Sequence, residues 1–330
     1  MNWITSIPIT MPDSLNKIYD IAIIGSGPAG FSASIYASRY KLSNIVFGNL
    51  LGGTISEAHK VCNYPGVSDI SGYDLAMNFY NQSKDLGGEY STEHIVDIKK
   101  EGDIFRLISD TQKEYFAKTV ILGIGTNRNK LNLKEEDRFL GKGVSYCATC
   151  DAMFYKDKVV VVVGGSNAAT MAASMLSEIA KKVYLIYRGT ELRGEPMWIE
   201  EVEKKENIEI IFTTIVIGLE GEEKLERIKL SREYNSSEYL DTDGLFVEIG
   251  SVPNVDLANK LGLELDSHRY IKVKEDQSTS LEGVWAAGDC TSASNRFRQV
   301  VTAASEGSIA ANSIFGYLRK GSSAYSTEIY

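Results

Sequence analysis

The chain has 330 residues, of which 43% are hydrophobic, and its 35 basic and 44 acidic residues give a formal net charge of −9. This length predicts two domains, each large enough to bury a hydrophobic core. The acidic balance argues against partners such as nucleic acid or an anionic membrane surface.

The first twenty residues lack the basic start and the apolar run of a signal peptide, and no stretch of the chain reaches the length of a membrane span. We therefore expect a cytoplasmic protein without a membrane partner. Four cysteines in a cytoplasmic chain of this length indicate redox or metal chemistry rather than a structural disulfide framework.

A short apolar strand over residues 20–24 leads into the turn GSGPAG at 25–30, and a helical pattern follows. In a dinucleotide-binding turn, the first glycine permits the bend, the second lets the backbone approach a pyrophosphate, and the third lets helix and strand pack closely. The order strand, turn, helix predicts such a site here, with an ordinary tight turn as the alternative. One usual element is missing, because residues 44–53 contain no acidic ribose ligand.

Two cysteines separated by two residues, Cys147 and Cys150, precede a second turn of this kind. Such a pair is typical of a redox-active disulfide or of a metal site. Zinc is the weaker option, because the other cysteines and the scattered histidines supply no second ligand pair at the usual spacing. We expect no metal.

A strand over 158–163 leads into GGSNAA at 164–169, a helical segment follows, and another strand covers 182–188. Two strand–turn–helix starts form a coarse internal repeat. The predicted fold class is therefore α/β, with two Rossmann-like three-layer dinucleotide-binding domains, the second inserted in the first. The glycine- and asparagine-containing segments 123–129 and 248–254 are the expected crossings. The expected boundaries are 1–125 with 252–330 for the split domain and 126–251 for the inserted domain.

Near the end of the chain, an apolar strand is predicted to finish at Gly288 and Asp289, before a polar loop and a helix of small residues. A carboxylate at this place is suited to accept a hydrogen bond from a ribityl or ribose hydroxyl. A turn or helix N-cap aspartate is the alternative interpretation.

Taken in order, the segments GSGPAG, CATCD, GGSNAA, AAGD and RQVVTAASEG resemble a low-molecular-weight thioredoxin reductase, a class II pyridine nucleotide-disulfide oxidoreductase. The resemblance extends over residues 18–318. It implies a thioredoxin-disulfide reductase in which electrons pass from NAD(P)H to FAD, then to the Cys147–Cys150 disulfide, and on to a thioredoxin or glutaredoxin-like protein. It also implies a homodimer.

The resemblance assigns FAD to the split domain and NADPH to the inserted domain, which also carries the disulfide. By this resemblance, Cys150 faces the flavin, Cys147 attacks the partner disulfide, and Asp151 is the acid/base. Asp151 is alternatively a helix N-terminal carboxylate. The positions that match the FAD contacts are Gly25, Gly27, Pro28, Ala29, Gly30, Gly52, Gly53, Thr54, Asn63, Gly288, Asp289, Arg298, Gln299 and Val300. Thr54 stands where the family usually has glutamine. We interpret Cys62 and Cys290 as packing residues.

The second nucleotide turn departs from the family pattern. It consists of Gly164, Gly165, Ser166, Asn167 and Ala168, and Ser166 adds a side chain where the backbone should approach the pyrophosphate. In the expected 2′-phosphate clamp, Arg188 and Arg193 remain, Gly189 replaces the middle arginine, and Glu191 adds a negative charge.

Three hypotheses about the electron route follow from this altered turn. The first is an NADPH-dependent thioredoxin reductase with a weaker site. The second is a flavin thioredoxin reductase that receives electrons from NADH, ferredoxin or another donor. The third is a flavin-dependent dithiol oxidase that passes electrons from a small dithiol to oxygen. The C-terminal tail is either a plain chain end or an aromatic lid, formed by Tyr325 or Tyr330, over the flavin.

Overall fold

In the computed structural model, residues 17–320 are described, and the chain divides into two compact units. The first unit comprises Met1–Ser56, Asp74–Gly125 and Val255–Tyr330, and the second comprises Glu57–Tyr73 and Thr126–Asn254. The second unit is thus inserted in the chain of the first. Residues 57–73, which the expected boundaries left in the split domain, group with the second unit. The tail tyrosines, Tyr325 and Tyr330, lie outside the described residues.

The sheet of the first unit has the strand order β3-β2-β1-β6-β5-β4, and β17 also pairs with β6. Strands β1, β2, β3, β6 and β17 pair in parallel, and β4 and β5 add antiparallel pairs. The strands are β1 (Ile18–Ile24), β2 (Asn44–Phe47), β3 (Glu89–Ser91), β4 (Ile95–Glu101), β5 (Ile104–Ser109), β6 (Glu114–Leu122) and β17 (Val284–Ala286). The parallel strands β1 and β2 are apolar and buried nearly throughout, because helices cover such sheets on both faces.

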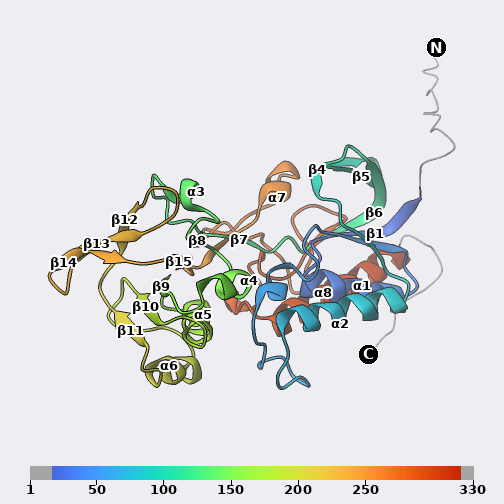
Figure 1. The fold of residues 1–330 in the computed structure, drawn as a ribbon. Coiled ribbons are helices and arrows are strands. Elements are labelled where there is room, and N and C mark those ends of the chain that lie inside the picture. Colours follow the sequence, from blue (N-terminus) through green and yellow to red (C-terminus); the bar gives the residue numbers. More distant parts are fainter. Residues whose placement is uncertain (1–16, 321–330) are drawn as a thin grey trace, which may run out of the picture. The chain divides into compact units, whose positions relative to one another are not determined.

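Helix α1 begins directly after β1 and packs against α8, so the two helices lie side by side (Figure 1). The approach is close, because a Cβ atom at Gly307 of α8 would lie 2.0 Å from the backbone oxygen of Ala29. The helices of this part are α1 (Pro28–Arg39), α2 (Gly72–Asp85), α7 (Asp256–Lys260) and α8 (Val300–Lys320), with the short 3₁₀ turns η1 (Gly53–Glu57) and η3 (Ser294–Arg296).

The second unit contains an all-parallel sheet in the order β11-β10-β9-β15-β8. Its strands are β8 (Val144–Ser145), β9 (Val159–Val163), β10 (Lys182–Ile186), β11 (Ile208–Ile211) and β15 (Gly244–Val247). Its helices are α3 (Glu136–Phe139), α4 (Ala148–Asp151), α5 (Asn167–Ser177) and α6 (Pro196–Glu203), with the 3₁₀ turn η2 (Ala152–Tyr155). Helix α5 follows β9 immediately, as α1 follows β1 in the first unit (Figure 1).

Two smaller sheets complete the second unit. One is antiparallel and contains β12 (Val216–Glu220), β13 (Arg227–Tyr234) and β14 (Ser237–Asp241). The other pairs β7 (Thr126–Arg128) with β16 (Ser251–Pro253), which are the two places where the chain enters and leaves the inserted unit. The predicted α/β class with two Rossmann-like units is confirmed.

Among residues 17–320, no helix is both long and apolar enough to cross a bilayer. Within the same described part of the chain, no group of three or more histidine, cysteine or acidic side chains could hold a metal ion.

Candidate active site

The turn between β1 and α1 has a backbone that only glycine permits. Gly25 has φ +118°, and a Cβ atom there would lie 2.0 Å from the carbonyl oxygen of Gly123. At Gly30 a Cβ atom would lie 1.9 Å from the carbonyl oxygen of Gly25, so helix and strand approach closely. Gly27 differs, because the nearest atom to a Cβ atom there is 3.7 Å away, on Gly52. The backbone at Gly27 is therefore open to a ligand, as a pyrophosphate site requires.

The loop before η1 faces this turn within the first unit. The backbone N–H of Gly52 donates to the carbonyl oxygen of Ser26 at 2.9 Å, and a Cβ atom at Gly53 would lie 3.3 Å from the Cα atom of Gly27. Pro28 and Ala29 begin α1, and the side chain of Thr54 is exposed in η1. The structure thus brings the predicted glycines of both segments together around one turn.

The missing acidic ribose ligand has a steric reason. Gly48 follows β2, and a Cβ atom at this position would lie 2.2 Å from the side-chain oxygen of Ser26. That oxygen donates to the carbonyl oxygen of Leu50 at 2.7 Å, and Tyr90 donates its hydroxyl to the carbonyl oxygen of Gly48 at 2.7 Å. Because the neighbouring groups fill this place, no side chain fits where the acidic residue usually stands.

The loop that follows β17 lies against the same turn. A Cβ atom at Gly288, which has φ +81°, would lie 3.1 Å from the Cβ atom of Ala29. Glu306 of α8 fixes this loop. Its buried carboxylate accepts hydrogen bonds from the Gly288 N–H at 2.7 Å and from the hydroxyls of Thr291 and Ser294 at 3.1 and 2.5 Å. Glu306 was not predicted. Its signal is that it is the one charged residue between Gln299 and Tyr317 in the sequence.

Asp289 is largely buried beside this loop, and burial raises the pKa of its carboxyl group to about 6. Arg298 opposes the rise and Glu306 adds to it. The Arg298 guanidinium lies 3.9 Å from the ring centre of Tyr270, and its Nε donates to the Asp289 carbonyl oxygen at 3.4 Å. Gln299 precedes α8, which begins at Val300. A carboxyl group that can accept or donate a hydrogen bond suits the hydroxyls of a ribityl chain. The residues of the first unit therefore fit a flavin cofactor.

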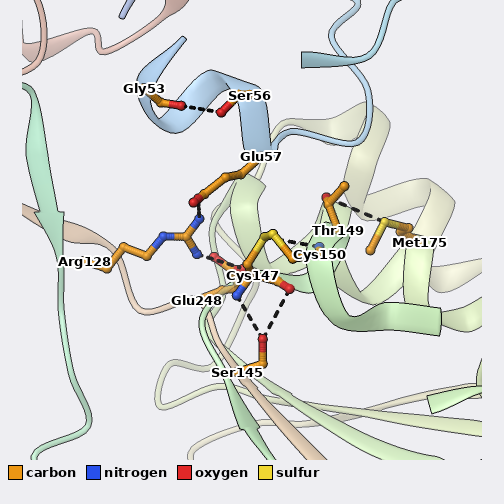
Figure 2. Close-up of a disulfide and its surroundings, with 10 residues drawn as sticks. All are labelled: Gly53, Ser56, Glu57, Arg128, Ser145, Cys147, Thr149, Cys150, Met175 and Glu248. Carbon is orange, nitrogen blue, oxygen red and sulfur yellow. Dashed lines mark hydrogen bonds and ion pairs between the residues drawn. A yellow bond between two sulfur atoms is a disulfide. The ribbon is translucent and has the colours of Figure 1, made fainter. Parts of the chain in front are cut away.

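The disulfide joins Cys147 to Cys150 in the second unit, at the start of α4 (Figure 2). Cys147 is the N-cap of this short helix, and its Sγ accepts a hydrogen bond from the Cys150 N–H at 3.2 Å. Ser145 supports the loop, because its hydroxyl accepts from the Cys147 N–H at 3.0 Å and donates to the Cys147 carbonyl oxygen at 3.2 Å. Cys150 is exposed and Cys147 is half-buried. The pair is therefore held by the backbone and is accessible within this unit.

The residues that follow the disulfide present apolar side chains to solvent. Asp151 ends α4, and its N–H donates to the Cys147 carbonyl oxygen at 3.2 Å. Met153 and Phe154 are 70% and 72% exposed in η2. Exposed side chains of this size next to a reactive group indicate a surface that contacts another protein.

An ion-pair cluster lies among the surroundings of the disulfide (Figure 2). Arg128, the last residue of β7, forms ion pairs with Glu57 and, at 3.7 Å, with Glu248. Burial raises the pKa of Glu248 to about 7, Arg128 opposes this rise, and Glu57 adds to it. None of these three residues was singled out from the sequence, because their separations of 71 and 120 positions leave no local pattern.

Asn63 and the two cysteines outside the disulfide differ in their burial. Asn63 is exposed and groups with the second unit. Cys62 is partly buried and is a free cysteine. Cys290 is fully buried in the core of the first unit, where burial raises the pKa of its thiol to about 12. Its burial agrees with a packing role.

In the second turn, Gly164 has φ +151°, and a Cβ atom there would lie 2.2 Å from the carbonyl oxygen of Glu248. Gly165 is buried, and Ser166 is the N-cap of α5 but makes no side-chain cap hydrogen bond. Asn167 and Ala168 begin α5. Arg188 and Arg193 follow β10 and are exposed. The turn therefore has the backbone form of a dinucleotide site, but its surroundings differ from those of the first turn.

Comparisons with known proteins agree with this arrangement. A family model described as pyridine nucleotide-disulphide oxidoreductase matches residues 19–307. The chain is 40% identical to the thioredoxin reductase of Mycoplasma genitalium over 292 residues, which cover 88% of this chain and 92% of the relative.

Solved structures give the same family. The T. acidophilum thioredoxin reductase matches with a TM-score of 0.85 and 34% identity, over 91% of this chain and 99% of that one. A ferredoxin-flavin thioredoxin reductase from Clostridium acetobutylicum matches with a TM-score of 0.52 and 35% identity, over 93% and 99%. The chain therefore belongs to the pyridine nucleotide-disulphide oxidoreductases and, within them, to the flavin-dependent thioredoxin-disulfide reductases.

Proposed function

We propose that the first unit holds FAD and that the Cys147–Cys150 disulfide carries electrons from it to a thioredoxin or glutaredoxin-like protein. The observation that carries this proposal is the accessible disulfide on a four-residue helix in the second unit. The FAD residues are those that form the glycine turn, the facing loop and the Asp289 loop. Bound FAD would supply a two-electron reductant for the disulfide.

In the proposed step, two electrons and two protons convert the disulfide to two thiols. Cys147 then loses its proton and attacks one sulfur of the partner disulfide, and the partner's other sulfur leaves as a thiolate, which takes up a proton. The Cys150 thiolate next attacks the mixed disulfide, which restores the Cys147–Cys150 bond and releases the reduced partner.

One hydrogen bond between the two cysteines supports a separate role for each of them. The N–H that Cys150 directs at the Cys147 Sγ would stabilise a negative charge on this sulfur after reduction. We therefore assign nucleophilic attack to Cys147. We assign Asp151, on the same helix, the protonation of the departing thiolate.

Two kinds of donor would supply electrons to the flavin. The family name implies a flavin and a nicotinamide cofactor. NADPH is one candidate, because Arg188 and Arg193 remain from the expected phosphate clamp, although Gly189 and Glu191 weigh against it. A ferredoxin-type protein is the second, because the Clostridium acetobutylicum relative that shares 35% identity is named for ferredoxin and flavin.

The proposal is tested with protein whose flavin has been photoreduced without any nucleotide. We expect the wild type to reduce a thioredoxin disulfide, and Cys147→Ser to retain flavin but fail to turn over. Cys62→Ser is the control that should retain activity. Turnover by Cys147→Ser would overturn the assignment of the disulfide.

We propose a homodimer, which light scattering of the purified flavoprotein tests by its molar mass. We also propose a cytoplasmic location, which cell fractionation tests.

A further inference from the structure

The ring of Tyr187 lies on the second nucleotide turn. A Cβ atom at Gly165 would come within 2.5–2.6 Å of three atoms of this ring, so the ring covers the backbone of the turn. Tyr187 is 8% exposed and follows β10 directly. In dinucleotide folds, the side chain at the end of this second strand contacts the adenosine ribose. Here the phenol ring at this position lies against the backbone that a pyrophosphate would approach.

Gly189 and Arg193 fit this tyrosine rather than a nucleotide. A Cβ atom at Gly189 would lie 2.5 Å from a ring carbon of Tyr187, so the ring excludes any larger residue, including the arginine expected here. The Arg193 guanidinium lies 5.8 Å from the ring centre, and the Arg193 N–H donates to the Gly165 carbonyl oxygen at 2.6 Å. The loop after β10 thus closes directly onto the turn.

Glu195 brings a carboxylate to the first residue of α5. The Asn167 side chain donates to Glu195 Oε1 at 3.0 Å and accepts from the Glu195 N–H at 2.5 Å. The start of this helix is where a pyrophosphate would be bound by the free N–H groups. A carboxylate held at this place repels a phosphate.

We infer that Tyr187 and Glu195 close the second dinucleotide turn, so that this protein binds neither NADPH nor NADH there. The nicotinamide cofactor that the family name implies does not fit these residues. This inference rests on the proposed function, because it concerns the route by which electrons reach the flavin. The two electrons needed for each disulfide then come from another donor, of the iron–sulfur carrier class, in two one-electron transfers.

The first experiment uses the flavin-loaded wild type without oxygen. We expect no saturable heat of binding with 2′,5′-ADP, NADPH or NADH, and no bleaching of the oxidised-flavin band by either reduced nucleotide. Stoichiometric bleaching or saturable binding by any of them would overturn the inference.

A second experiment opens the turn. The variant Tyr187→His with Gly189→Arg and Glu195→Ala should gain saturable binding of 2′,5′-ADP, with flavin content and melting temperature as checks of folding. Because Tyr187 is buried, replacing it can disturb folding, so Glu195→Gln is tested as a second variant. This single change keeps the contacts to Asn167 and removes the charge. We expect it alone to give weak binding of inorganic pyrophosphate. If both folded variants bind no more ligand than the wild type, Tyr187 and Glu195 are not what closes the turn, and the inference fails.

A third measurement separates this inference from the proposed function. The inference and the proposed function are both supported if photoreduced protein reduces thioredoxin and if NADPH and NADH neither bind to the wild type nor bleach its flavin. If the nucleotides bleach the flavin and thioredoxin is reduced, the inference fails and the proposed function stands. If photoreduced protein leaves thioredoxin oxidised, the proposed function fails whatever the nucleotides do.

Discussion

Glu306 in α8 accepts a 2.7 Å hydrogen bond from the backbone N–H of Gly288, the residue before Asp289. The same carboxylate accepts from the hydroxyls of Thr291 and Ser294, so one side chain holds the loop that follows β17. Because Asp289 lies in this loop, Glu306 positions the residue that we expect at the ribityl chain. Glu306 acts through the loop and is therefore a positioning residue.

Glu306→Ala should weaken both folding and flavin binding. The change leaves the buried N–H of Gly288 without its acceptor, which costs about 1–3 kcal/mol. The hydroxyl of Thr291 retains the Gly288 carbonyl oxygen as an acceptor at 3.0 Å. The free energy of unfolding by urea and the flavin dissociation constant measure the two effects. Glu306→Gln retains an acceptor oxygen and should recover most of the flavin affinity. Equal losses in both variants would contradict a positioning role.

Local spacing in the sequence predicted the parts of the site whose geometry is local. Gly25 and Gly30 were found because a tight turn between strand and helix needs glycine at fixed intervals. Cys147 and Cys150 were found because a disulfide exchange pair needs short spacing. Glu306 and Gly288 meet only after α8 packs beside the β17 loop, and 18 residues separate them. No local pattern encodes such a contact.

The altered positions also needed the structure for their explanation. The sequence showed Gly189 as a missing arginine, but the ring of Tyr187 is the reason. It also showed that the acidic ribose ligand was absent, and the Ser26 side chain against Gly48 explains this absence. A side chain's direction depends on its packing, which spacing along the chain does not give.

Gly25→Ala should abolish flavin binding. A methyl group there would lie 2.0 Å from the Gly123 carbonyl oxygen, and φ +118° is strained for alanine. The backbone at the turn must move, which disrupts the approach to the pyrophosphate. Gly316→Ala is the matched control, because a Cβ atom there meets nothing within 4 Å in α8 and should stabilise by up to about 1 kcal/mol. Absorbance of the bound flavin after gel filtration measures the outcome, and a normal flavin content in Gly25→Ala would contradict it.

Replacing Met153 and Phe154 by alanine should raise KM for the protein partner. Both side chains are exposed, three and four residues after Cys150, so a thioredoxin that reaches the disulfide would cover them. Loss of two apolar contacts of this kind corresponds to about a tenfold increase in KM. A small disulfide substrate should be reduced at the wild-type rate. Met197→Ala, a change at another exposed methionine, in α6, is the control. An unchanged KM for thioredoxin would exclude this surface.

Glu248 should make stability fall as pH rises. Burial raises the pKa of its carboxyl group in the folded protein from 4.5 to about 7. Between these two values, the unfolded chain releases the proton while the folded chain retains it, so the free energy of unfolding decreases with pH in this window. The contribution is complete below pH 4.5 and is lost above about pH 7.

Glu248→Gln isolates this effect, because the amide does not titrate. The free energy of unfolding of the wild type minus that of the variant should fall by at most about 1.4 kcal/mol per pH unit across the window. Arg128→Met removes the cation that lowers the pKa of Glu248, while Glu57, which raises it, remains. The window should therefore extend to higher pH in Arg128→Met. Urea unfolding of the flavin-loaded proteins, followed at several pH values, measures both differences. A wild-type minus Glu248→Gln difference that stays constant through the window would show that Glu248 is ionised in the folded protein.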